Sequence, residues 1–100
     1  MLYAFMLVDH PDAAELRAQH RPAHRAYLAE VADRICVAGP LLAEDGATMT
    51  GSLLVIDFES RDAATAWLHD EPFTRAGVYA RREVHPMLSL WPQRAGVVAS

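Results

Sequence analysis

The stretch "LYAFMLV", residues 2–8, is apolar at both its odd and its even positions, and "SLLVIDFE", residues 52–59, has the same property over most of its length. Successive side chains of a strand point to opposite faces of a sheet. A short run that is apolar at both parities therefore predicts a strand buried on both sides. The two runs predict two central strands of one sheet.

The segments around these runs predict two helices. Residues 13–33 carry the 3-and-4 spacing of a buried helical stripe, with Leu28 and Val31 among its members. A second helix is expected to begin after Ser60, which has the chemistry of an N-cap. It is expected to end near Pro72, because the residue before a proline is disfavoured in helical geometry.

The remaining segments predict two outer strands. "RICVAGP", residues 34–40, is short and rich in branched side chains, and Asp45-Gly46 marks a turn in the connection over residues 42–51. "REVHPMLSLW", residues 82–91, alternates in polarity and contains a proline, which is typical of an edge strand.

The resulting order, β-α-β-β-α-β, is the ferredoxin-like α+β arrangement, a four-stranded antiparallel sheet with two helices on one face. The first and third strands are central in that topology, in agreement with the two apolar runs. The second face of the sheet would be apolar and uncovered, which predicts a second protomer or a ligand on it. Residues 1–92 are expected to form this single domain, followed by a C-terminal tail, residues 93–100, without a recognisable pattern.

Composition limits the partners and the location of the chain. Its 100 residues are 52% apolar and 22% charged, with a net charge of −4 and no basic run, so neither nucleic acid nor an anionic membrane is expected as a partner. The apolar N-terminus is too short to cross a bilayer and lacks the basic leader of a signal peptide, so we expect a cytoplasmic protein. Cys36, the single cysteine, lies in an apolar strand segment and is predicted to be buried and unreactive.

The motif "HRPAH", residues 20–24, places two histidines four residues apart, a spacing that can bind zinc on a continuous helix. Arg21 would put a positive charge beside the metal. Pro22 is expected to kink the helix or to restart it, which would take His20 off the face of His24. No metal is therefore predicted, and His20 is expected to be solvated.

His24 lies on the apolar stripe of the first helix and is expected to face the interior. Its spacing alone allows two interpretations. One is a partly buried histidine satisfied by a single hydrogen bond, and the other is a general acid or base.

The stretch "HDEPFTRAGVY", residues 69–79, contains two adjacent carboxylates, Asp70 and Glu71, at the end of the predicted second helix. That end of a helix is electrostatically unfavourable for an anion, although a solvated helix end is the ordinary interpretation. Pro72 forces Glu71 out of helical geometry and could direct its carboxylate across the fold. Phe73 can anchor the turn in the core.

In their order and spacing, "RPAHRAYL", "AGP", "TGSLLVIDF" and "AATAWLHDEPFTRAGVY" resemble the YCII-related family of small ferredoxin-like proteins, from residue 2 to about residue 91. The resemblance implies a homodimer packed through the sheet faces, the dimeric α+β barrel. It also implies an active site centred on a histidine, matched by His24, and an acid. The acid usually is an aspartate directly before Pro-Phe or Pro-Tyr. In this chain that position holds Glu71, with Asp70 one place earlier.

The candidate catalytic residues are thus His24, Glu71 and Asp70. A carboxylate near His24 would hold its ring in one tautomer and favour its protonated form. A further polar group would stabilise charge on a substrate oxygen. The candidates for substrate binding are Arg21, Ser52, Gly39, Pro40 and Phe73.

The sequence contains no nucleophilic Ser or Cys constellation, no phosphate-binding glycine loop and no flavin or nicotinamide signature. This favours proton transfer without a cofactor on a small oxygenated organic molecule, as in isomerisation, lactone opening or an elimination such as dehydrohalogenation. Two other functions stay open: a module that binds a small metabolite without turnover, and an accessory dimer without a ligand. A filled space around His24 would favour the accessory dimer.

Overall fold

The computed structural model describes residues 1–91, so the predicted tail lies outside the described residues. Its elements follow the expected order, with two short helical segments added. They are β1 (Leu2–Asp9), α1 (Ala14–Ala29), the 3-10 helix η1 (Ala32–Arg34), β2 (Ile35–Leu42), β3 (Met49–Asp57), α2 (Arg61–Asp70), α3 (Pro72–Ala76) and β4 (Tyr79–Met87).

The four strands form one antiparallel sheet in the order β2-β3-β1-β4, which confirms that β1 and β3 are central. Phe5 of β1 lies opposite Leu54 of β3, and Tyr3 lies opposite Ile56. All four side chains are buried. Pro86 lies in the edge strand β4. An edge strand has a neighbouring strand on one side only, so it needs no donor for a second neighbour, and the N–H that a proline lacks is not missed.

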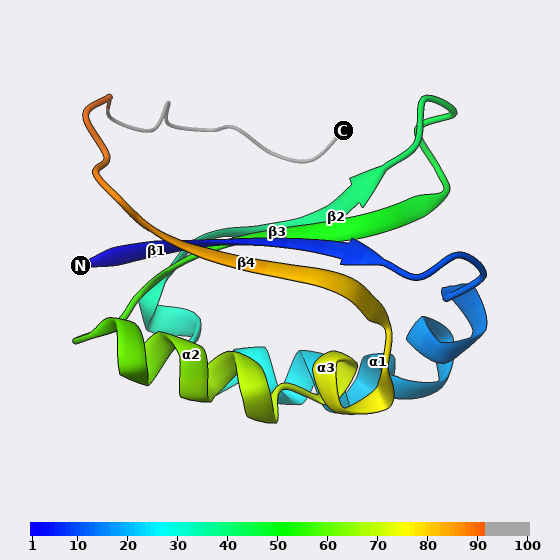
Figure 1. Ribbon diagram of the computed structural model, residues 1–100, viewed down its shortest axis with the longest axis horizontal. Coiled ribbons are helices and arrows are strands. Elements are labelled where there is room, and N and C mark those ends of the chain that lie inside the picture. Colours follow the sequence, from blue (N-terminus) through cyan, green and yellow to red (C-terminus); the bar gives the residue numbers. More distant parts are fainter. Residues whose placement is uncertain (92–100) are drawn as a thin grey trace.

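The helices lie together on one face of the sheet (Figure 1), as the ferredoxin-like topology requires. The core fills the space between the two layers, and several of its side chains have no exposed surface: Phe5, Leu7, Ile56 and Val78. Trp67 of α2 adds an aromatic contact, with its ring centroid 5.5 Å from that of Phe5. Within residues 1–91, no helix is long and apolar enough to span a membrane.

The opposite face of the sheet, called the open face below, carries no helix of the described residues (Figure 1). Its centre is apolar: Met6, Val37 and Val55 point to it, because they alternate with residues that face the helices. Met6 is 38% exposed and Val37 is 50% exposed. Arg81 and Glu83 of β4 give the open face a charged border and form a 2.8 Å ion pair.

Helix α1 is continuous across Pro22, so the restart, one of the two expected alternatives, is wrong, and the kink stays a prediction. A proline inside a helix removes one N–H donor, and the acceptor that it would have served, the carbonyl of Ala18, belongs to an exposed residue. Water can satisfy an exposed carbonyl, which makes the proline tolerable here. The helix ends at Ala29, before the expected boundary at residue 33, and the 3-10 helix η1 follows.

Cys36 is exposed, so its predicted burial is wrong. The register between β2 and β3 shifts between Ile35 and Val37, and Cys36 occupies this irregularity. It lines a small cavity on the open face together with Leu2 and Val37. An apolar strand segment buries every side chain only if both faces of the sheet are covered, and within the described chain one face is not.

The last strand lies earlier than predicted, at Tyr79–Met87 instead of residues 82–91. Leu88 and Leu90, which the alternation placed in the strand, are exposed beyond its end. The unpredicted helix α3 precedes the strand and is capped by Gly77, whose φ of 81° lies in the left-handed region that glycine adopts without strain. The chain enters β4 immediately after Val78.

Gly51→Ala is expected to destabilise the fold by about 1–3 kcal/mol, because a Cβ on Gly51 would overlap the backbone carbonyl of Leu7 in the neighbouring strand. Gly39→Ala is the matched control: a Cβ there meets no atom within 4 Å. Its stability should change by less than about 0.5 kcal/mol. Urea unfolding followed by circular dichroism measures both, and equal losses would contradict the prediction.

Candidate active site

A cavity of about 660 Å³ opens between α1, β2 and the start of β3. His24 lies in the wall of this cavity. So do all the residues that the sequence predicted to bind substrate: Arg21, Gly39, Pro40, Ser52 and Phe73. Glu71 is fully buried behind the wall, and Asp70 lies on the outer surface. A space of this size accommodates one small molecule.

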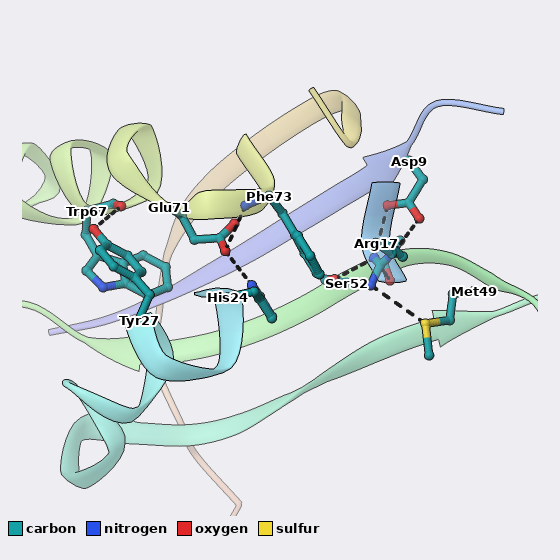
Figure 2. Close-up of polar contacts among 10 residues, drawn as sticks. Asp9, Arg17, His24, Tyr27, Met49, Ser52, Trp67, Glu71 and Phe73 are labelled. Atoms are coloured by element: carbon teal, nitrogen blue, oxygen red, sulfur yellow. Dashed lines mark hydrogen bonds and ion pairs between the residues drawn. The ribbon is translucent and has the colours of Figure 1, made fainter. Parts of the chain in front are cut away.

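His24 and Glu71 are hydrogen-bonded through Nδ1 and Oε1 (Figure 2). The side chain of Glu71 is completely buried, whereas that of His24 is 14% exposed. The same carboxylate oxygen accepts a 3.2 Å hydrogen bond from the backbone N–H of Phe73. Since Glu71 occupies Nδ1, Nε2 is the ring nitrogen left for a molecule in the cavity.

The junction between α2 and α3 explains why Glu71, and not Asp70, reaches His24. Pro72 keeps Glu71 extended, with φ −66° and ψ 133°, so that α2 ends and α3 begins at this residue. Glu71 is therefore the N-cap of α3, where a carboxylate is favourable, and not an anion at the unfavourable end of α2. Asp70 still belongs to α2, and its 61% exposed side chain contacts His69 at 3.1 Å.

Phe73 separates two polar side chains at the cavity. The His24 ring stacks on the Phe73 ring, with 3.9 Å between centroids and 6° between planes. The guanidinium carbon of Arg17 lies 5.1 Å from the same ring centroid. In Figure 2 the Phe73 ring lies between His24 and Arg17. Because Phe73 is buried, it fixes the distance between the two groups.

Arg17 is the candidate that the sequence analysis missed. Its guanidinium is bonded to Asp9 at 2.6 and 3.0 Å, to the carbonyl oxygen of Gly51 at 2.9 Å and to Ser52 Oγ at 2.9 Å. Nη1 lies 3.8 Å from the sulfur of Met49, which is only a weak acceptor. Nη1 therefore keeps donor capacity for a ligand oxygen.

The sequence did contain a signal for Arg17. Residues 17, 21, 24 and 28 follow the 4-3-4 spacing of a single helix face, so the face that carries His24 also carries Arg17. The predicted stripe ran from Arg21 through His24 to Val31 and ended one turn short of Arg17. Its partner Asp9 stands at the end of β1, a position that spacing within the helix does not reveal.

Tyr79 lies on the far side of the Phe73 ring, edge-on, with 6.2 Å between ring centroids. Its hydroxyl is buried near Ser52 without a well-aligned hydrogen bond to any described residue, and Oε2 of Glu71 also has no hydrogen-bond partner among residues 1–91. Burial, and next the negative charge of Glu71, raises the pKa of Tyr79, so the hydroxyl stays protonated at neutral pH.

His20 lies one helical turn from His24 on the continuous helix α1, and it is partly buried instead of solvated as expected. In the part of the chain that the structure describes, no three His, Cys, Asp or Glu side chains are grouped as a metal site.

This arrangement is chemically suited to proton transfer. With Nδ1–H directed at the Glu71 carboxylate, Nε2 carries a lone pair that can accept a proton from a bound molecule. The carboxylate then stabilises the imidazolium. Arg17 and Ser52 lie on the other side of Phe73, where their donors would suit an oxygen that becomes negative.

Comparison with known proteins gives matches over most of the chain. A model of the YCII-related domain matches residues 1–88. Protein YciI of Escherichia coli O6:H1 is 41% identical over 93 residues, covering 86% of this chain and 95% of that protein. A protein of Haemophilus influenzae is 36% identical over the same shares of both chains.

A solved structure matches as well. It is 5-chloro-2-hydroxyhydroquinone dehydrochlorinase (TftG) from Burkholderia phenoliruptrix AC1100, in complex with 2,5-dihydroxybenzoquinone. The two structures superpose with a TM-score of 0.81 at 34% identity, covering 88% of this chain and 94% of the dehydrochlorinase chain.

Asp9→Ala is expected to destabilise the fold by about 3 kcal/mol, because it leaves the buried Arg17 guanidinium without its counter-charge. The double variant Asp9→Ala, Arg17→Met should be more stable than Asp9→Ala, since no unpaired charge remains. Urea unfolding measures both changes.

The control for this prediction is Asp57→Ala, which breaks the exposed 2.9 Å pair with the N-terminal ammonium. It should cost less than about 1 kcal/mol. A double variant less stable than Asp9→Ala alone would show that Arg17 stabilises the fold even without its counter-charge, against the prediction.

Proposed function

Because the chain belongs to the YCII-related family, we propose that it is a cofactor-free acid–base enzyme that acts on a small oxygenated organic molecule. The observation that carries this proposal is the His24–Glu71 hydrogen bond at the wall of the 660 Å³ cavity. A histidine with a buried carboxylate on one nitrogen and an open cavity at the other is arranged as a general base or acid. The open cavity also argues against an accessory dimer without a ligand.

The likeness to a dehydrochlorinase favours elimination among the three reaction types. In such a step His24 Nε2 removes a proton from the substrate, and the electron pair of the broken bond forms a new double bond. Chloride leaves with the electrons of the carbon–chlorine bond, and the imidazolium later returns its proton to solvent. Isomerisation and lactone opening would use the same base.

Other residues of the wall have supporting roles in this mechanism. Glu71 does not line the cavity, so it acts through His24 as a positioning residue: it orients the ring and stabilises its charged form. Arg17 Nη1 and the Ser52 hydroxyl lie on the opposite side of Phe73 and donate to the substrate oxygen on which negative charge develops.

We also propose that the chain forms a homodimer through its open face. The apolar centre of this face supports the proposal, because Met6 and Val37 expose apolar surface that is unfavourable in water. A domain of this length also buries a smaller share of its surface than a larger one, so association adds stability. The dimer would cover Cys36.

His24→Asn is expected to reduce kcat/KM by about 10²- to 10⁴-fold, the usual contribution of a general base. The assay is chloride release from 5-chloro-2-hydroxyhydroquinone, the compound named for the related dehydrochlorinase. Glu71→Gln should lower kcat with little change in KM, because a neutral amide no longer stabilises the imidazolium that forms as the proton is removed. A purely structural role of Glu71 would instead lower the stability of the fold and leave kcat of the folded protein unchanged.

Asp70→Asn is the matched control, since it removes the neighbouring but exposed carboxylate and should leave kcat and KM unchanged. An unchanged rate in His24→Asn would contradict the mechanism. Binding of 2,5-dihydroxybenzoquinone by the wild-type chain without turnover of any compound tested would instead favour the metabolite-binding module.

Val37→Glu is expected to raise the dimer dissociation constant at least ~100-fold, because the symmetric interface would bring two unpaired carboxylates together. Sedimentation velocity at micromolar concentration measures this. Ala66→Glu, at an exposed position of α2, makes the same change of charge and should leave the dimer intact. A wild-type chain that sediments as a monomer would disprove the dimer.

A further inference from the structure

We propose that the substrate carries a carboxylate and that Arg21 and Arg25 bind it, while the reacting part of the molecule lies against His24. The inference rests on the proposed function, because it names the chemical class that the same cavity accepts. The cavity wall is positively charged. It contains Arg17, Arg21 and Arg25, and no Asp or Glu of residues 1–91 lines it.

This concentration of positive charge does not follow from composition. The chain has 13 acidic and 9 basic residues and a net charge of −4, yet three of its arginines meet at one cavity. Three acids contact residues of the wall without lining the cavity: Asp9 and Glu71 pair with Arg17 and His24, and Asp45 accepts hydrogen bonds from Ala47 and Thr48. The charge that faces the cavity therefore stays positive.

Arg21 and Arg25 are the arginines of the wall that are free to bind a ligand. Arg17 is saturated on most of its nitrogens by protein acceptors. Arg21 and Arg25, in contrast, form neither an ion pair nor a side-chain hydrogen bond with any of residues 1–91. Both are exposed toward the cavity, so an anion reaches them without loss of an existing contact.

The placement of these arginines has no evident benefit for the helix itself. Residues 17, 21 and 25 follow each other at i, i+4 spacing, where like charges destabilise a helix. The favourable interaction of a cation with the helix dipole is confined to the last turn, and α1 has no basic residue in its last turn. A bound anion would offset this repulsion.

The geometry of α1 sets where the anion lies relative to the base. Arg21 lies three residues before His24 and four before Arg25, so its side chain neighbours both on the helix surface, whereas His24 and Arg25 are consecutive. All three residues line the same cavity, so an anion held by the two guanidiniums shares that cavity with His24. Apolar residues complete the wall and suit an organic ring: Leu28, Leu54, Pro40 and Phe73.

A carboxylate fits this site better than a phosphate. Phosphate sites commonly combine cations with free backbone N–H groups at a helix N-terminus or in a loop. Arg21 and Arg25 stand in the middle of α1, where backbone N–H groups are already engaged in the helix. A planar carboxylate matches the guanidinium fork through side-chain donors alone.

The test compares two ring compounds that differ by the carboxylate, 2,5-dihydroxybenzoate and hydroquinone, by calorimetry without oxygen at low salt. The wild-type chain should bind 2,5-dihydroxybenzoate at least ~10-fold more tightly. Arg21→Gln and Arg25→Gln should each remove most of this preference. Arg75→Gln, an exposed arginine of α3 outside the cavity, is the matched control and should retain it.

Equal affinity for the two compounds, or no binding of 2,5-dihydroxybenzoate, would overturn the inference. So would a preference for the carboxylate that survives in both Arg21→Gln and Arg25→Gln. Tighter binding of inorganic phosphate at the same arginines would also overturn it. His24→Asn separates this inference from the proposed function. That variant should lose turnover but keep the preference for the carboxylate. A preference without any wild-type turnover would contradict the acid–base mechanism and leave the carboxylate site standing.

Discussion

The buried carboxylate of Glu71 ties the helical layer together around the site. A carboxylate without contact to solvent is tolerated only if hydrogen bonds or charges compensate its lost hydration. Its partners are His24 of α1 and the backbone N–H of Phe73 in α3. A helix as short as α3 is not stable alone, so its first turn depends on this cap. One acid thereby positions both the histidine and the aromatic ring on which the histidine stacks.

The cavity wall repeats one arrangement on the two sides of Phe73. On each side a basic group lines the cavity and an acid is buried behind it: His24 with Glu71, and Arg17 with Asp9. The acids orient the basic groups and are themselves kept from the cavity. In the proposed mechanism such a wall would favour a bound molecule that gains negative charge, because fixed donors need no rearrangement to stabilise it.

Periodicity predicted the parts of the fold that depend on burial alone. The two-sided apolar runs located the central strands β1 and β3, and Pro86 marked β4 as an edge strand. Features that depend on tertiary contacts were missed or misplaced. The predicted burial of Cys36 was wrong because one face of the sheet is open in the described chain. Helix α3 was missed because its cap, Glu71, gains its hydrogen-bond partners only in the folded chain.

The candidate site likewise combines residues that the sequence predicted with contacts that only the folded chain reveals. Sequence placed His24 and Glu71 as candidates, but it could not choose between Glu71 and Asp70. That choice depends on the end of α2 at Pro72, and helix ends are set by single residues. Arg17 was detectable from its spacing to Arg21 and His24. Its pairing with Asp9 was not, because that contact joins the end of a strand to a helix.

The charge of the whole chain and the charge of the cavity act over different distances. A net charge of −4 repels anions only weakly beyond about 8–10 Å at physiological salt, because mobile ions screen it. Inside the cavity the nearest charges are arginines, and an apolar wall of low polarisability strengthens their effect. An acidic composition therefore argues against long polyanions such as nucleic acid, which contact a wide surface. It does not argue against a small anion that contacts only the cavity wall, and local placement of charge decides which ligand is bound.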